Sequence, residues 1–147
     1  MADLTEVTAK VQRILANNWR TELDGSEGFY VRFESTGCRV SCHQGEDDDD
    51  EVIIKISAPI LFDVPVTNDL FRWVATQGAN YRFGNAHLYL DESETKASLF
   101  YTHMLLGDYL DAEELNWAVG AVGFTADRLD DELLPLFGGR RLADPAG

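Results

Sequence analysis

The chain has 147 residues, a length typical of one domain in the usual range of about 50–250 residues. Hydrophobic residues make up 45% and aromatic residues 11%, which is enough to build a core and argues against a disordered chain. There are 26 Asp and Glu against 12 Lys and Arg, and the formal net charge of −14 argues against nucleic acid or an anionic membrane as partner.

Apolar residues at helical spacing predict a first helix that begins at Leu4 and ends within residues 19–23. Alternation of apolar and polar residues then predicts three strands, over 29–34, 36–43 and 51–57. Short strands separated by turn residues are typical of an antiparallel meander.

Six consecutive acidic residues, 46–51, join the second and third of these strands. An EF-hand loop needs ligands at alternating positions, with Gly at the sixth position and Glu at the twelfth, and this segment does not fit that register. Because like charges repel one another, we expect a solvated hairpin tip here. Weak cation binding through the same residues is the alternative.

Residues 60–66 are expected to form a buried connector to a second helix, which begins after Thr67 and ends at Gly78. Two more strands are predicted over 86–91 and 96–106. These two strands are expected to extend the sheet beyond the three strands of the meander.

The last helix is predicted to begin after Asp111, where Asp111 and Glu114 resemble a capping box. Its main apolar stripe starts at Leu115 and recurs at helical spacing. Trp117 and Phe124 lie on the opposite side, so this helix has a second apolar stripe.

Together the elements predict a single α+β domain over residues 1–140, followed by a flexible tail over 141–147. We expect a five-stranded antiparallel sheet with three helices, in the order α-βββ-α-ββ-α, and helices mainly on one face.

The last predicted strand is apolar on both faces. Leu99, Tyr101 and Leu105 point to one side, and Phe100, Met104 and Leu106 point to the other. In a sheet covered on one side only, apolar and polar residues should alternate. The second face is therefore covered either by a connector or helix of the same chain, or by a subunit or peptide, since aromatic residues and Met are enriched at such contacts.

No pattern in the sequence predicts catalysis or a metal site. His43, His87 and His103 lie on three different predicted strands instead of forming a cluster. Cys38 and Cys42 would lie about 13 Å apart on a strand, too far for a disulfide. There is no G-x-S-x-G motif and no phosphate-binding glycine loop. We therefore predict no enzyme activity and no cofactor, and the reduced thiols together with the lack of a signal peptide predict the cytoplasm.

Several phrases of the sequence resemble the YbjN-domain family. They are APILFDVP over residues 58–65, NYRFG over 80–84, and LDAEELN over 110–116, which opens a helix that runs through ADRLDDEL over 126–133. The order of elements is also similar to that of the type III secretion chaperone-like fold. The resemblance covers residues 11–139.

This resemblance implies a small, usually dimeric α+β domain without catalytic residues, whose secretion-chaperone relatives hold extended segments of client proteins. In those relatives the second helix and the following strand form much of the dimer contact. By position, and with two residues added from the last strand, the expected dimer or client contacts are Phe71, Trp73, Val74, His87, Tyr89, Tyr101 and Met104.

We therefore expect a cytoplasmic, non-enzymatic protein that binds peptides or proteins as a chaperone or regulator and acts as a homodimer. Its partners would be a second copy of itself and an extended segment of a client. One alternative is a self-associating scaffold module with one fixed partner. The other is a protein that binds cations through the acidic segment.

Overall fold

The structure is a computed structural model that describes residues 3–24, 28–46 and 51–145. These residues form three helices and six strands. In chain order they are α1 (Leu4–Asn18), β1 (Thr21–Asp24), β2 (Gly28–Arg32), β3 (Gly37–Gln44), β4 (Val52–Pro65), α2 (Asn68–Gln77), β5 (Asn85–Leu90), β6 (Lys96–Leu106) and α3 (Ala112–Phe137). The predicted α+β class is confirmed.

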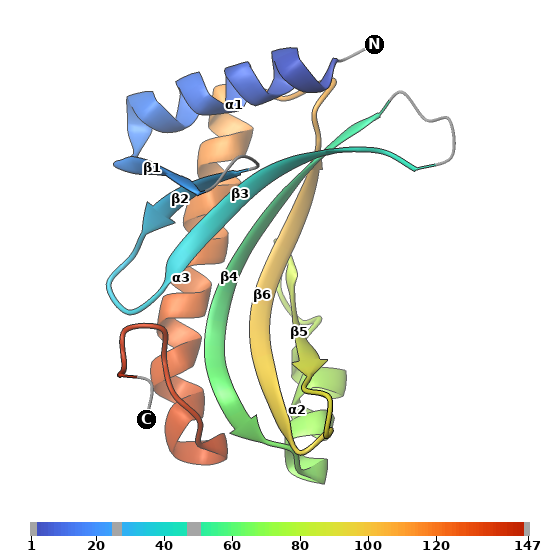
Figure 1. The fold of residues 1–147 in the computed structure, drawn as a ribbon, viewed down its shortest axis with the longest axis vertical. Coiled ribbons are helices and arrows are strands. Elements are labelled where there is room, and N and C mark those ends of the chain that lie inside the picture. The colour runs from blue at the N-terminus through green and yellow to red at the C-terminus, as the bar shows by residue number, and fades with distance from the viewer. Residues whose placement is uncertain (1–2, 25–27, 47–50, 146–147) are drawn as a thin grey trace.

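The strands lie in the order β1-β2-β3-β4-β6-β5, and each neighbouring pair is antiparallel. Figure 1 shows a curved sheet with the long helix α3 along one face, α1 across one end and α2 beside β5 at the other end. The face that packs against α1 and α3 is the covered face. The opposite face carries no helix among the described residues, and we call it the open face.

The core lies between the covered face of the sheet and the helices. α3 contributes the apolar stripe predicted from the sequence, and Asp111 caps this helix by accepting a hydrogen bond of 2.7 Å from the backbone N–H of Glu114. The buried apolar residues of α3 are Leu115, Ala118, Val119, Val122, Ala126, Leu129 and Leu133. Burial of this stripe holds α3 along β4 and β6.

The sheet has six strands and not the five predicted, because residues 21–24 form β1 instead of the end of the first helix. The chain is already extended at Trp19 (φ −136°, ψ 152°). Trp19 Nε1 donates a hydrogen bond of 3.1 Å to Asn116 Oδ1, and the indole ring packs on Phe33. These contacts with α3 and with the residue that follows β2 direct the chain into the sheet edge.

The predicted connector over residues 60–66 is also wrong, since most of it belongs to β4, which has 14 residues. Register shifts between Pro59 and Leu61 and between Leu61 and Val64 mark two irregularities in the pairing with β6. Asp63, which lies within the second irregularity, has a positive φ of 54°. Such bulges accommodate a proline within a strand, because the ladder of hydrogen bonds is interrupted there in any case.

A buried carboxyl group joins α3 to the loop between β2 and β3. Asp130 is 0% exposed, and its Oδ2 lies 2.6 Å from the hydroxyl oxygen of Ser35. The same hydroxyl oxygen lies 2.5 Å from Oδ1 of Asp127, which also accepts the backbone N–H of Ser35 at 2.7 Å. The pKa of Asp130 is raised to about 6, chiefly by burial; the hydrogen bond with Ser35 works against this rise, the carboxylates of Asp131 and Asp127 add to it, and the charge of Arg141 opposes it.

Candidate functional site

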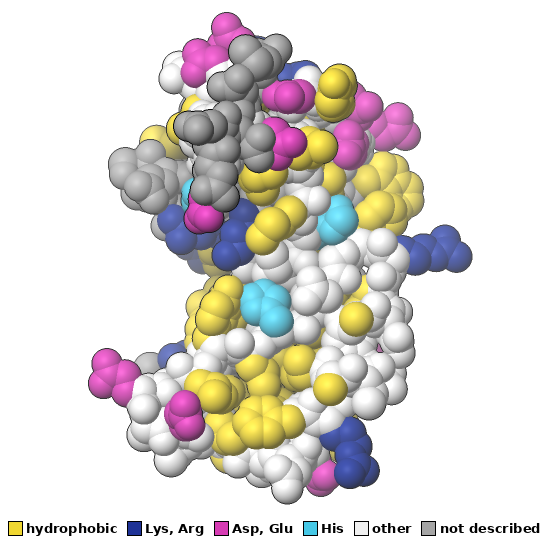
Figure 2. Space-filling model, turned by 90° about the vertical axis from the view of Figure 1, so that its right-hand side faces the viewer, with side chains coloured by type: hydrophobic (Ala, Val, Ile, Leu, Met, Phe, Trp, Pro, Cys, Tyr) yellow, Lys and Arg dark blue, Asp and Glu magenta, His cyan; other side chains and the backbone are white. Residues whose placement is uncertain are grey.

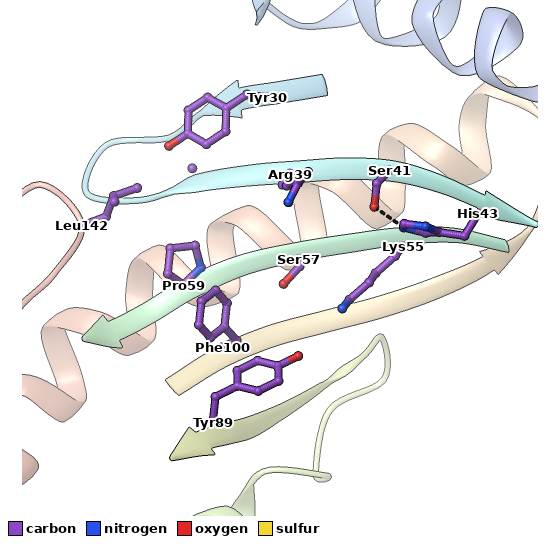
Figure 3. A pocket seen from close by; sticks show the side chains of 11 residues that line it. Tyr30, Arg39, Ser41, His43, Lys55, Ser57, Pro59, Tyr89, Phe100 and Leu142 are labelled. Atoms are coloured by element: carbon purple, nitrogen blue, oxygen red, sulfur yellow. Dashed lines mark hydrogen bonds between the residues drawn. The ribbon is translucent and has the colours of Figure 1, made fainter. Parts of the chain in front are cut away.

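A groove of about 420 Å³ lies on the open face of the sheet. Its floor is formed by β3 and β4, and aromatic side chains from β2 on one side and from β5 and β6 on the other form its walls (Figure 3). We call it the sheet groove. It is lined by Tyr30, Gly37, Arg39, Ser41, His43, Lys55, Ser57, Pro59, Tyr89, Phe100 and Leu142.

Strand alternation places the floor residues on the open face. Lys55, Ser57 and Pro59 of β4 alternate with core residues that point toward α3. The antiparallel register puts Ser57 between Arg39 of β3 and Thr102 of β6. Side chains that are far apart in the sequence therefore form one continuous row across the strands.

The sheet groove has an apolar end and a polar end. In Figure 3, Pro59, Phe100 and Leu142 lie toward one end, whereas Lys55 and His43 lie toward the other. At the apolar end the rings of Phe100 and Tyr89 meet edge to face, with centroids 5.4 Å apart. This end can contact an apolar side chain, and the opposite end can hydrogen-bond to a charged or polar one.

The wall formed by Tyr30 depends on a glycine in the neighbouring strand. A Cβ atom at Gly37 would lie only 1.7 Å from the hydroxyl oxygen of Tyr30. Only a residue without a side chain therefore lets the tyrosine ring lie against β3 in this position.

Hydrogen bonds between side chains connect the strands on the open face. His87 Nε2 and Thr102 Oγ1 are 2.7 Å apart, and Thr102 Oγ1 shares a hydrogen bond of 3.1 Å with Ser57 Oγ. Burial lowers the pKa of His87, and the nearby charge of Lys55 lowers it further. This imidazole is therefore neutral at pH 7 and takes part in a structural row of hydrogen bonds.

The open face has no complete set of groups for catalysis or metal binding among the residues that the structure describes. Ser41 Oγ and His43 Nε2 are 2.7 Å apart, but within this part of the chain no carboxylate bonds the His43 ring and orients it as a base. The described ranges also contain no group of three or more His, Cys, Asp or Glu side chains that could hold a metal ion. The geometry of the open face therefore supports the binding of a ligand in the sheet groove.

The structure brings together two of the residues predicted as contacts and places a third on the same face of the sheet. The His87 and Tyr89 rings lie 5.0 Å apart and both pack on Phe100, and of these predicted contacts Tyr89 lines the sheet groove. Met104 lies on the open face further along β6, where it is paired with Lys55 and is 57% exposed.

The other predicted contacts lie elsewhere. Phe71 on α2 is exposed, whereas Trp73 and Val74 are half-buried and pack against the core. Tyr101 is 1% exposed on the covered face, and its hydroxyl donates a hydrogen bond to the backbone oxygen of Phe83. The expectation for Tyr101 therefore needs correction, because a core side chain is not accessible to a partner.

Sequence reasoning missed several residues of the sheet groove, above all Tyr30, Arg39 and Lys55. Lys55 gave the clearest signal, because it is the one charged residue within the apolar run VIIKI of β4. A cation at that position must lie on a face that is open to solvent or to a partner.

A second groove, of about 440 Å³, lies on the outer side of α3. Trp19, Trp117, Gly120 and Phe124 contribute to its lining, and Trp117 and Phe124 are 63% and 62% exposed. We call it the α3 groove. The second apolar stripe predicted for this helix is thus exposed in the single chain.

The acidic segment 46–51 connects β3 to β4, and residues 47–50 lie outside the described residues. At the base of this connection the backbone N–H of Gly45 donates a hydrogen bond of 2.7 Å to the oxygen of Glu51. The predicted hairpin between these strands is confirmed by their antiparallel pairing.

Figure 2 views the molecule from the side on which β5 and β6 lie in Figure 1. Hydrophobic side chains gather in the lower centre of this view, whereas most of the acidic side chains lie in its upper part. None of the described helices is both long and apolar enough to cross a membrane.

Comparison with known proteins finds a matching family model and similar solved structures. Residues 4–145 match the family model described as "TY-Chap1: T3SS (YopN, CesT) and YbjN peptide-binding chaperone 1". The crystal structure of YbjN from E. coli is similar, with a TM-score of 0.61 and 10% sequence identity over 87% of this chain and 91% of that one. No match was found among curated proteins.

Proposed function

The chain belongs to the TY-Chap1 family of peptide-binding chaperone-like domains, and from that premise we propose that it binds an extended segment of a client protein in the sheet groove. The observation that carries this proposal is the groove itself, an aromatic-walled channel on the one sheet face that the described helices leave open. The same proposal makes the protein a non-enzymatic chaperone or regulator.

The dimensions of the sheet groove suit an extended chain. Its floor follows β4 over the five residues from Lys55 to Pro59, whose ends lie about 13 Å apart along a strand. A bound segment of four or five extended residues would span this length. The aromatic walls would contact its side chains, and aromatic rings contribute strongly to such interfaces.

Filling the groove tests the proposal. Ser57→Trp places a large ring on the floor, and Thr5→Trp adds the same ring at an exposed position of α1 as a matched control. We would measure the anisotropy of a fluorescently labelled, reduced and unfolded α-lactalbumin. Binding should weaken about tenfold or more in Ser57→Trp and remain unchanged in Thr5→Trp. Equal binding by both variants, with unchanged circular dichroism, would refute the assignment of the groove.

We also propose that the protein is a cytoplasmic homodimer in which α2 and β5 form the contact. β5 is an edge strand, and Phe71 and Tyr89 expose aromatic rings on these two elements. A two-fold copy would cover such an edge with the same surface of its partner. The two free cysteines support a reducing compartment.

Light scattering over a dilution series tests the dimer. Phe71→Asp should shift the mass toward the monomer, 16.4 kDa, whereas Tyr109→Asp, at a solvent-exposed loop position, should not. A monomeric mass for the unmodified chain at high micromolar concentration would refute the homodimer.

A self-associating scaffold module is the second candidate function, and the α3 groove favours it. Contiguous apolar surface of this kind marks interaction sites on soluble proteins. Loss of self-association in Trp117→Asp, with retention in Phe71→Asp, would assign the contact to α3. The scaffold function would gain further support if client binding were absent in the same preparation.

A further inference from the structure

The sheet groove differs in charge from the rest of the molecule. The chain as a whole has a formal net charge of −14, yet the residues that line the groove include Arg39 and Lys55 and no Asp or Glu. We propose that the client segment is acidic: a carboxylate of the segment contacts Lys55 and Arg39, and a bulky apolar residue four positions away occupies the aromatic end. This inference rests on the proposed function and names the chemistry of its ligand.

Lys55 is the central observation. Its side chain stands on β4, in the middle of the sheet, with Ser41 on one neighbouring strand and Met104 on the other. It is half-buried, and it makes no hydrogen bond or ion pair with the residues that the structure describes. An ammonium group that has lost part of its hydration gains most from an anionic ligand.

The polar surroundings of Lys55 suit a carboxylate. Ser41 lies directly across from Lys55 on β3, and Ser57 lies two residues further along β4, so both supply hydroxyl groups beside it. Arg39 adds a second positive charge to the lining of the groove. His43 completes this end of the groove (Figure 3). Hydroxyl and cationic donors together form a site for an anion.

The opposite end of the sheet groove determines the spacing in the ligand. Pro59 lies four residues after Lys55 on β4, and Phe100 and Tyr89 stand beside it. In an extended ligand, residues four positions apart lie about 13 Å from each other and point to the same side. An acidic residue and a bulky apolar residue at that spacing would reach both ends at once.

Three labelled peptides of 12 residues in a Gly/Ser background test this inference by fluorescence anisotropy at 0.15 M salt. The first carries glutamate and tryptophan four positions apart, the second replaces the glutamate by lysine, and the third places the two residues five positions apart. The overall negative charge of the protein favours the lysine peptide, so a preference for the glutamate peptide reports the local chemistry of the groove.

We expect the first peptide to bind about tenfold more tightly than either of the others. Lys55→Glu should abolish or reverse the preference for glutamate over lysine. Arg13→Glu, an exposed residue of α1 outside the groove, changes the net charge by the same amount and should leave the preference intact.

Equal binding of the glutamate and lysine peptides, or an unchanged preference in Lys55→Glu, would overturn the inference. So would binding of unfolded α-lactalbumin with no binding of any peptide. In each of these cases the proposed function still stands if Ser57→Trp blocks the unfolded protein. Failure of the unfolded protein to respond to Ser57→Trp would remove the proposed function itself.

Discussion

The replacement Asp130→Asn should change how the stability of this protein depends on pH. The hydroxyl oxygen of Ser35 lies within 2.6 Å of one carboxylate oxygen of Asp130 and 2.5 Å of one of Asp127. A hydroxyl group has one hydrogen and can donate to only one of them. The other short contact needs a proton on a carboxyl group, and below pH 6 the fully buried Asp130, with its raised pKa, is the group that carries it.

The sign and size of the effect follow from the pKa. The pKa of Asp130 rises from its ordinary value of 3.8 to about 6 in the folded chain, so below pH 4 the group is protonated in both states and has no effect. Above pH 4 the unfolded state loses the proton first, and the free energy of unfolding falls until the folded state also ionises near pH 6. At 1.36 kcal/mol per pKa unit, the loss above pH 6 amounts to about 3 kcal/mol.

The amide side chain that Asp130→Asn introduces is neutral at every pH and keeps the shape of the protonated carboxyl group. The variant should therefore match the unmodified chain near pH 4 and exceed its free energy of unfolding by up to about 3 kcal/mol at pH 8. Urea unfolding followed by tryptophan fluorescence from pH 4 to pH 8 measures this difference. Glu132→Gln, at an exposed position of the same helix, is the control and should show no such trend. A difference between Asp130→Asn and the unmodified chain that does not vary with pH would refute the reasoning.

Two pairs of substitutions test the packing on either side of the sheet. Gly123→Ala should lower the free energy of unfolding by about 1–3 kcal/mol, because its Cβ would lie 2.1 Å from the Phe33 ring. In Gly120→Ala the new Cβ would lie 3.8 Å from Phe124 and Trp19, an ordinary van der Waals contact, so this variant should be neutral or stabilising in thermal unfolding. Leu99→Ala removes a fully buried side chain and should cost about 2–5 kcal/mol in urea unfolding, whereas Met104→Ala on the open face should stay within about 0.5 kcal/mol. Equal losses within either pair would contradict the assigned burial.

The order of the main elements could be predicted because each has a strong local signal. The capping residue Asp111 and the stripe that follows it define α3 without tertiary information. β1 could not be predicted in this way, since four residues with little apolar alternation become a strand only by pairing with β2. The second half of β4 was missed because Pro59 and Pro65 read as breakers, and the bulges that admit them depend on the pairing with β6.

The candidate site depends even more on tertiary structure. Alternation within β6 correctly separated Phe100 and Met104 from the core side of the strand. It could not show that Tyr30 stands over Gly37, or that Leu142 closes the same groove, since these contacts join distant parts of the chain. The sequence indicated an open apolar face. The groove on that face depends on the register between paired strands, which the sequence did not predict.

β4 and β6 are neighbours in the sheet, although α2 and β5 separate them along the chain. During folding, the meander of β1 to β4 can form from local contacts, whereas β6 must close a longer loop before it pairs. Until then β4 is an edge strand with the apolar run VIIKI, a pattern that promotes aggregation between chains. Lys55 interrupts that run with a charge and acts as a gatekeeper, so the residue that we place at the centre of client binding also protects the chain while it folds.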